Sequence, residues 1–363
     1  MMIRPGRSVA LAIMLALAAC TSGPEATDAT ADDGSGDTRA TSPATVPPEA
    51  QTPSPQPEPE LPEITSVRQA GGEALRAPAS ADWVLVDFGR AWVSGVGKGI
   101  GFYDAETGRL EGSVAMPQSP CASMDSGFGA VWTATCGEQG IARIDPESGK
   151  VTNWVAVAVP AEGESSIGAG EGGIWAISDG DGCSGCALVR IDPETVKVTD
   201  TYDVPQGGTA VRAGLGGIWI TYSLEDRVVR VDAETGEVVW EIDVGLGPRF
   251  LDVGEGGVWV MNQLDGSVSH VDPTSNEVVA TIPVDTVIEG GDLTVGEGFV
   301  WLRASSEMVA QIDPATDRVV ARIGSPQASG SAHASDGQLW ISTHVERVQG
   351  WRAVLYRIPL MDG

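Results

Sequence analysis

Basic residues and histidines are scarce in this sequence of 363 residues. Lys plus Arg number 22 against 50 Asp plus Glu, which gives a formal net charge of −28. A sequence-independent nucleic-acid binder needs a basic footprint, so this balance argues against nucleic acid as a partner. With only 3 His, few candidates exist for a His-based triad or a His-rich metal site. No apolar run approaches the about 20 residues that a membrane-spanning helix requires.

The first twenty residues have the features of an export signal. Arg4 and Arg7 precede an apolar run over 9–19, and residues 17–20 read Leu-Ala-Ala-Cys. This order resembles a bacterial lipoprotein signal, whose lipobox reads Leu, two small residues and Cys. The resemblance implies that 1–19 are a signal peptide removed by cleavage, and that lipid on Cys20 anchors the protein to the outer side of the cell membrane. An ordinary signal peptide with a chance Cys is the alternative.

Residues 20–63 have the composition of a disordered linker. From Thr21 to Glu63 there are 9 Pro, 9 acidic residues and one basic residue, and no aromatic residue. Such a stretch cannot bury enough apolar surface to offset its ordering entropy. We therefore expect the folded domain to occupy residues 64–363.

A repeat of about 40 residues organises the rest of the chain. A tryptophan follows a Gly-containing turn seven times, and about ten residues later comes a second turn such as Ile144-Asp145-Pro146 or Val231-Asp232-Ala233. Asp, Pro and Gly are the residues that such turns require, and short runs rich in Val and Ile flank them. One repeat therefore reads as four strands, which is one blade of a β-propeller. The repeated tryptophans are Trp92, Trp132, Trp175, Trp219, Trp259, Trp301 and Trp340.

Seven repeats predict an all-β, seven-bladed propeller of four-stranded blades. The repeats resemble those of the YVTN and virginiamycin-B-lyase-like propellers. The last blade lacks an outermost strand, and we expect Ile64–Val67 to complete it. Fold alone does not assign function. We expect a monomeric, non-enzymatic scaffold that binds a small molecule or an envelope protein, without a cofactor. A lyase-type enzyme is the main alternative, and a quinoprotein-like propeller the lesser one.

The column of residues seven positions before each tryptophan is the main candidate site. It belongs to the innermost strand of each blade, which lines the central channel, and its residue type changes from blade to blade. Arg212, Asp252 and His333 belong to this column. Arg249, Arg303 and His344 depart from their repeat pattern and are expected near the same end of the channel. We treat these six residues as candidate ligand contacts, on the face that carries the variable loops. The alternative is a set of channel residues that only contact water.

The remaining cysteines are best explained as two local disulfides. Cys121 and Cys136 flank one Gly turn, and Cys183 and Cys186 share a Gly-rich loop. Disulfides are the default in an exported protein. A Cys₄ zinc site, a redox Cys-x-x-Cys pair and a Ca²⁺ site in the Asp-rich loop 178–182 are weaker alternatives. His270 occupies a column of long polar side chains, so we interpret it as structural.

Overall fold

The computed structural model describes residues 60–77, 81–95, 99–116, 120–135, 140–160, 167–180, 183–285, 287–326, 330–347 and 350–360. The predicted signal peptide, Cys20 and the linker up to residue 59 lie outside these ranges. The compact unit that contains the repeats spans Glu58–Gly363. In the described part of the chain the regular elements are β-strands, and no helix is long and apolar enough to cross a membrane.

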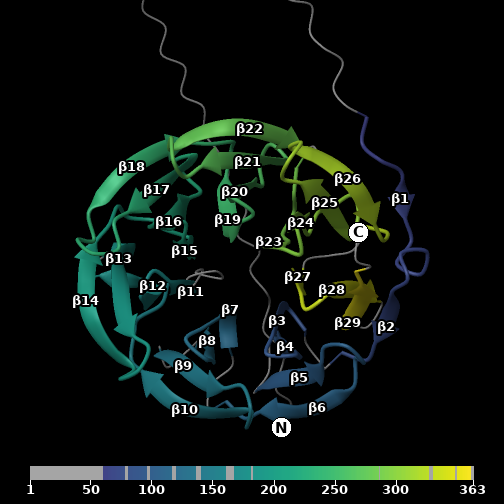
Figure 1. The fold of residues 1–363 in the computed structure, drawn as a ribbon, viewed down its shortest axis with the longest axis horizontal. Helices are drawn as coiled ribbons and strands as arrows, with labels where there is room; N and C mark the ends of the chain where they lie inside the picture. The colour runs from purple at the N-terminus through teal and green to yellow at the C-terminus, as the bar shows by residue number, and fades with distance from the viewer. Residues whose placement is uncertain are drawn as a thin grey trace, which may run out of the picture. The chain divides into compact units, whose positions relative to one another are not determined.

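Seven antiparallel sheets stand side by side in a ring (Figure 1), which confirms the predicted seven-bladed propeller. The innermost strand of each blade contacts that of the next, and blade seven contacts blade one. Blade one contains β3 (Trp83–Asp87), β4 (Arg90–Ser94), β5 (Ile100–Asp104) and β6 (Leu110–Val114). Blade two contains β7 (Pro120–Gly127), β8 (Ala130–Thr135), β9 (Gly140–Asp145) and β10 (Lys150–Val155). Blade three contains β11 (Ile167–Gly170), β12 (Gly173–Gly180), β13 (Cys183–Asp192) and β14 (Lys197–Asp203).

The remaining blades repeat this order from the centre of the ring to its rim. Blade four contains β15 (Ala210–Gly214), β16 (Gly217–Tyr222), β17 (Arg227–Val231) and β18 (Val238–Asp243). Blade five contains β19 (Pro248–Gly254), β20 (Gly257–Asn262), β21 (Ser267–Asp272) and β22 (Glu277–Pro283). Blade six contains β23 (Leu293–Gly296), β24 (Phe299–Leu302), β25 (Val309–Asp313) and β26 (Arg318–Ile323). Blade seven contains β27 (Ala332–Ser335), β28 (Gln338–Arg347) and β29 (Gly350–Pro359).

The ring is closed by a different segment from the one expected. β2 (Glu73–Leu75) pairs antiparallel with β29 and supplies the fourth strand of blade seven. β1 (Ile64–Thr65), expected in that place, instead pairs parallel with β26 as a fifth strand of blade six. The residues between β1 and β2 form a turn, in which the Ala70 N–H donates to the Ser66 carbonyl at 3.0 Å. The N-terminal run therefore covers the edges of two blades.

The Gly turn determines the register of each inner hairpin. In blade four, Leu215 and Gly216 have φ of 52° and 77°, the left-handed geometry of a tight two-residue hairpin turn. This turn places Arg212 opposite Trp219. The indole Nε1 of Trp219 then donates to the Gly214 carbonyl at 3.0 Å, a contact that five other blades repeat. Every blade tryptophan is buried, so the predicted repeat marker is the core of each blade.

The topology gives the ring two distinct faces. The turn face carries the Gly turns between first and second strands and the Asp turns between third and fourth strands. The loop face carries the connections between second and third strands and the links from one blade to the next. On the turn face, the Asp192 carboxylate accepts from the side chain and the backbone of Thr195, both at 2.7 Å, and these hydrogen bonds lower the pKa of Asp192. The turn chemistry expected from the sequence is therefore present.

Candidate functional site

The column predicted to line the channel does lie at the centre of the ring. Each of its members pairs with the blade tryptophan, and six of the seven line one central cavity. The seventh is Gly168, where an added Cβ would lie 3.0 Å from the Cα of Arg212. Blade three therefore needs glycine because the backbone of blade four approaches it closely. The six cavity-lining members are Leu85, Asp125, Arg212, Asp252, Thr294 and His333.

Arg212 joins three successive blades at this level of the channel. Its Nε lies 3.5 Å from Oδ1 of Asp252 in blade five, so these two residues form an ion pair. Its Nη1 donates to the Ile167 carbonyl in blade three at 3.0 Å. Asp252 in turn accepts from the Val295 N–H in blade six at 2.8 Å. One arginine and one aspartate thus connect four neighbouring innermost strands.

Asp125 and His333 make the same kind of contact elsewhere in the ring. Asp125 accepts from the Ala169 N–H of blade three at 2.8 Å, and His333 Nδ1 accepts from the Val86 N–H of blade one at 3.2 Å. Burial raises the pKa of Asp125 to about 6, although Arg212 opposes this shift. Burial also lowers the pKa of His333, which favours the neutral imidazole that this acceptor role requires. Among the described residues, no carboxylate hydrogen-bonds to His333, so the pair of a His base and an acidic partner that a lyase-type enzyme could use is not formed there.

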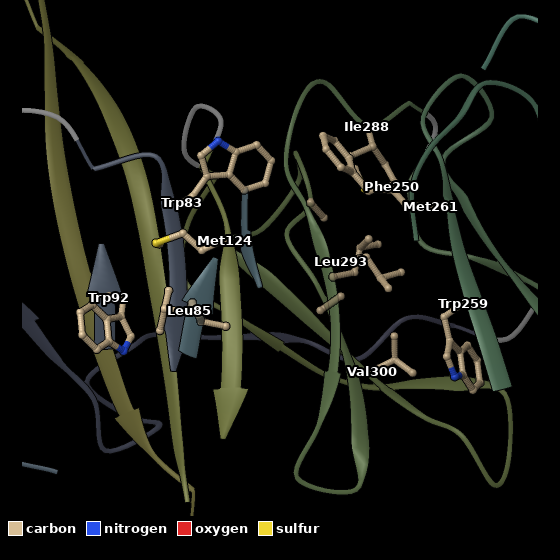
Figure 2. Packing of buried hydrophobic residues seen from close by; sticks show 14 of the residues in the cluster. Trp83, Leu85, Trp92, Met124, Phe250, Trp259, Met261, Ile288, Leu293 and Val300 are labelled. Carbon is tan, nitrogen blue, oxygen red and sulfur yellow. The ribbon is translucent and has the colours of Figure 1, made fainter. Parts of the chain in front are cut away.

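An apolar plug separates this polar layer from the loop face. Trp83 of blade one reaches across the ring to Phe250 of blade five, with ring centroids 5.8 Å apart and planes at 62°. Met124 and Leu293 belong to the same buried cluster, whose packing is shown in Figure 2. The polar cavity beneath has a volume of ≈ 40 Å³, which is room for a few water molecules. Pockets for organic ligands are typically about 300–1,000 Å³, so this cavity is too small for one.

Two of the other three candidate residues, Arg249 and Arg303, do not line this cavity. Arg249 lies over the ring of Phe250, 5.8 Å from its centroid, at the loop-face side of the plug. Arg303 is 1% exposed, and its Nη1 donates to the carbonyls of Ala304 and Met308 at 2.8 and 2.7 Å. Burial lowers the pKa of Arg303 to about 10, an effect that Glu307 opposes. His344 is part of β28, and its side chain lies outside the described part of the structure.

Acidic residues at the Gly turns form a second set of contacts between blades that the sequence analysis did not identify. The Glu255 carboxylate accepts from the Gly298 N–H of the next blade at 3.1 Å. Glu171, Glu297 and Asp336 make the equivalent contact in their blades. The recurring acidic residue at the first turn position could have indicated this role. A repeated carboxylate on this face is therefore part of the frame.

The column of long polar side chains beside the tryptophans is also structural. Arg230 lies over the indole of Trp219 at 5.2 Å and donates to the Pro273 carbonyl of the next blade at 2.9 Å. His270 stacks on Trp259 with ring centroids 3.9 Å apart, and its Nδ1 lies 2.7 Å from Asp317 of the next blade. Both side chains cover a tryptophan and join two blades, as expected for His270.

The structure contains one of the two predicted disulfides. Cys183 and Cys186 form a disulfide with their Cα atoms 6.0 Å apart, which confirms that part of the prediction. Cys136 lies outside the described residues and so does the Cys121 side chain, so their pairing stays a prediction. Over the ranges that the structure describes, no group of three or more His, Cys, Asp or Glu could hold a metal ion. Part of the Asp-rich loop, 181–182, lies outside those ranges.

Comparison with known proteins identifies the architecture. No protein-family model matches the chain, and no curated protein matches its sequence. The structure of U3-55K matches with a TM-score of 0.64 at 12% identity and covers 80% of this chain and 98% of that one. The Pan2 WD40 domain of Neurospora crassa gives 0.57 at 10% identity, covering 78% and 90%. BamB from Moraxella catarrhalis gives 0.52 at 13% identity, covering 77% and 85%. These structural matches establish the β-propeller fold. Because the sequence identities are low, they show nothing about function.

Proposed function

We propose that the protein is an extracytoplasmic lipoprotein, held at a membrane by lipid on Cys20, whose propeller is a scaffold that binds another protein through its loop face. The plug formed by Trp83 and Phe250 is the observation that carries this proposal. The cavity beneath it, among the residues that the structure describes, has room for water only, so we place the binding function on a face of the ring. The contacts of Arg212, Asp252 and His333 connect blades, and their role in this proposal is to hold the frame rigid.

The loop face is favoured over the turn face because its segments vary. The Gly and Asp turns of the opposite face repeat closely, and their side chains satisfy one another within and between blades. Binding and catalytic residues concentrate on variable loops that a rigid scaffold positions. Arg249 lies on the loop face beside the plug and remains a proposed contact. The YVTN-like repeats supply the frame in this proposal and specify no reaction.

Anchoring is tested by fractionation. The full chain should remain with membranes in high salt and dissolve in detergent, because two or three acyl chains, at roughly 0.8 kcal/mol per buried CH₂, anchor it firmly. A Cys20→Ser variant should carry no lipid and should keep residues 1–19, since the lipid-dependent cleavage is lost, so both its apparent mass and its fractionation should differ from those of the native chain. Unchanged fractionation and unchanged mass would show that Cys20 carries no lipid.

Protein binding is tested by photo-crosslinking in native envelopes. A photoreactive residue is placed at Gln206, an exposed position in the link between blades three and four on the loop face. The matched control carries it at Glu234, an exposed position in an Asp turn of blade four on the opposite face. A discrete crosslinked product from the loop-face position alone supports the proposal. A product only from Glu234, or none from several loop-face positions, contradicts it.

A further inference from the structure

The loop face carries a group of exposed aliphatic side chains over blades four and five. Leu224 is 96% exposed, the highest value for any large hydrophobic residue in the described part of the chain. Leu264, Leu246 and Val287 are 65%, 51% and 43% exposed. Single exposed leucines are ordinary, but a group of them on neighbouring loops marks an interaction site. We call these four side chains the aliphatic patch.

Hydrogen bonds join the loops of the aliphatic patch into one surface. The Asp226 carboxylate accepts from the Gly247 N–H at 2.8 Å, which connects the loop of Leu224 to the link that holds Leu246. The Leu264 N–H donates to the Leu246 carbonyl at 3.0 Å. The Ile288 N–H donates to the Gln263 carbonyl at 2.8 Å, which brings the segment of Val287 to the same surface.

Carboxylates fix the conformation of these loops without covering the aliphatic side chains. The Asp265 carboxylate accepts from the Leu246 N–H at 2.7 Å, so the exposed leucine lies on a segment whose backbone is held. The Val284 N–H donates to the Gly266 carbonyl at 3.0 Å. A surface that is already ordered loses little conformational entropy on binding. The loops therefore present the patch in a form ready to bind.

The surroundings of the patch are acidic. The loop-face segments of blades four and five, 222–227, 243–249, 262–267 and 283–290, hold six acidic residues and two arginines. The acidic residues are Glu225, Asp226, Asp243, Asp265, Asp285 and Glu289, and the arginines are Arg227 and Arg249. Arg227 is itself paired with Glu225 and Glu241. The charge around the patch is thus strongly negative.

This charge selects among the possible occupants. A second copy of the chain would bring two acidic surfaces together, and the linker of this chain is itself acidic, with nine acidic residues and one basic residue over 21–63. An anionic lipid surface would be repelled for the same reason. A protein segment with an apolar face flanked by Lys or Arg complements both the aliphatic side chains and the charge.

We propose that the aliphatic patch binds a cationic, amphipathic segment of a partner protein. This inference rests on the proposed scaffold function and adds to it the place of contact and the chemistry of the partner. The leucines would bury in the apolar face of the segment, while its basic residues pair with the surrounding carboxylates. Because exposed charges contribute to the contact, raising the salt concentration should weaken it.

The test uses the full chain and synthetic peptides of 18 residues, with binding followed by fluorescence anisotropy. The first peptide presents Leu on one helical face and Lys on the other. A second peptide replaces Leu by Ser and keeps the charge, and a third replaces Lys by Glu and keeps the apolar face. Saturable binding of the first peptide alone supports the inference. Equal binding of the second or third peptide, or no saturable binding at all, overturns it.

Matched variants locate the contact on the chain. Leu224→Ser with Leu264→Ser should weaken binding at least about tenfold, because each leucine would otherwise be buried. Leu110→Ser, which removes a leucine that is 58% exposed on the outer strand β6, should change it less than about twofold. An equal effect of the two changes would overturn the patch as the site.

Charge reversal supplies the second comparison. Asp243→Lys with Glu289→Lys, next to the patch, should weaken binding more than Glu194→Lys with Glu234→Lys on the turn face, which change the net charge by the same amount. Equal losses would show a response to net charge only and would overturn the inference.

The oligomeric state, measured by sedimentation, gives a further check. If the native chain is a dimer and the variant with Leu224→Ser and Leu264→Ser is a monomer, the inference is also overturned. If loop-face crosslinking in envelopes succeeds while the peptides fail, the scaffold function stands and the proposed partner chemistry fails.

Discussion

Truncating Trp83 should test whether the plug holds opposite sides of the ring together. Trp83 and Phe250 belong to blades one and five and are 8% and 2% exposed. Their edge-to-face contact at 5.8 Å is the kind of aromatic pair that contributes about 0.5–1.5 kcal/mol beyond area burial. Trp83→Ala removes this contact together with the packing against Met124 and should lower the free energy of unfolding by about 4 kcal/mol.

The measurement is equilibrium unfolding in urea, followed by circular dichroism. A double-mutant cycle with Phe250→Ala isolates the contact across the ring, and the coupling energy should be about 1 kcal/mol. Trp240→Ala is the matched control, because Trp240 is 50% exposed on the outer strand β18 and should cost less than about 1 kcal/mol. A loss as small as that of Trp240→Ala, or a coupling energy of zero, would refute the reasoning that the plug holds opposite sides of the ring together.

Three further predictions concern the closure, the turn contacts and the buried carboxylate. Deletion of residues 1–66 should leave the protein folded and soluble. Deletion of residues 1–76 also removes β2 and exposes the edge of β29, so this variant should aggregate, as seen by size-exclusion chromatography. Equal behaviour of the two variants would contradict the assigned closing strand. Glu255→Ala should lower the free energy of unfolding by about 1 kcal/mol in the same urea assay, because Glu255 bonds to the next blade. Glu234→Ala, which removes no such bond, should lower it by less than about 0.5 kcal/mol. Equal effects would show that the turn contact does not contribute to stability. Burial raises the pKa of Asp125 to about 6, above its value in the unfolded chain, so its contribution is present below about pH 4 and is lost as pH rises through about 6. The stability of Asp125→Asn relative to the native chain should therefore improve between pH 4.5 and pH 7.5, and a constant difference across this range would show that Asp125 titrates normally.

The sequence predicted those features of the fold that depend on local register. Two-residue turns such as Leu215-Gly216 fix which residues face each other, so the spacing from Arg212 to Trp219 was enough to identify the innermost strand. The Asp turns follow from side chains that bond only to residues two or three positions later. The number of blades followed directly from the repeated tryptophans.

Features that depend on contacts between distant blades were not predictable in this way. Ile64–Thr65 and Glu73–Leu75 are both short strand-like runs, and their places depend on which edge each reaches after the turn between them. Trp83 and Phe250 lie on the innermost strands of blades one and five and meet across the centre of the ring. A local sequence pattern does not predict this contact. The burial of Arg303 has a local cause instead, because its Nη1 donates to carbonyls one and five positions later, in a loop conformation that the repeat pattern did not predict.

Variation within the channel column has a structural explanation in this protein. Its residue type changes because its polar members bond to different neighbouring strands: Asp125 accepts from Ala169, Asp252 from Val295 and His333 from Val86. Arg212 reaches a carbonyl in blade three and a carboxylate in blade five, and Gly168 is small because the backbone of blade four approaches it. Arg212, Asp125, Asp252 and His333 thus use their polar groups to connect the blades.

The side chains over blades four and five behave in the opposite way. Carboxylates hold the backbone of these loops, while Leu224 and Leu264 remain exposed to water. Exposure of aliphatic groups on an ordered surface costs free energy that another protein surface can recover on binding. The polar residues of the channel column bond within the ring and belong to its frame, whereas the exposed aliphatic patch on ordered loops is the surface where we propose that a partner binds.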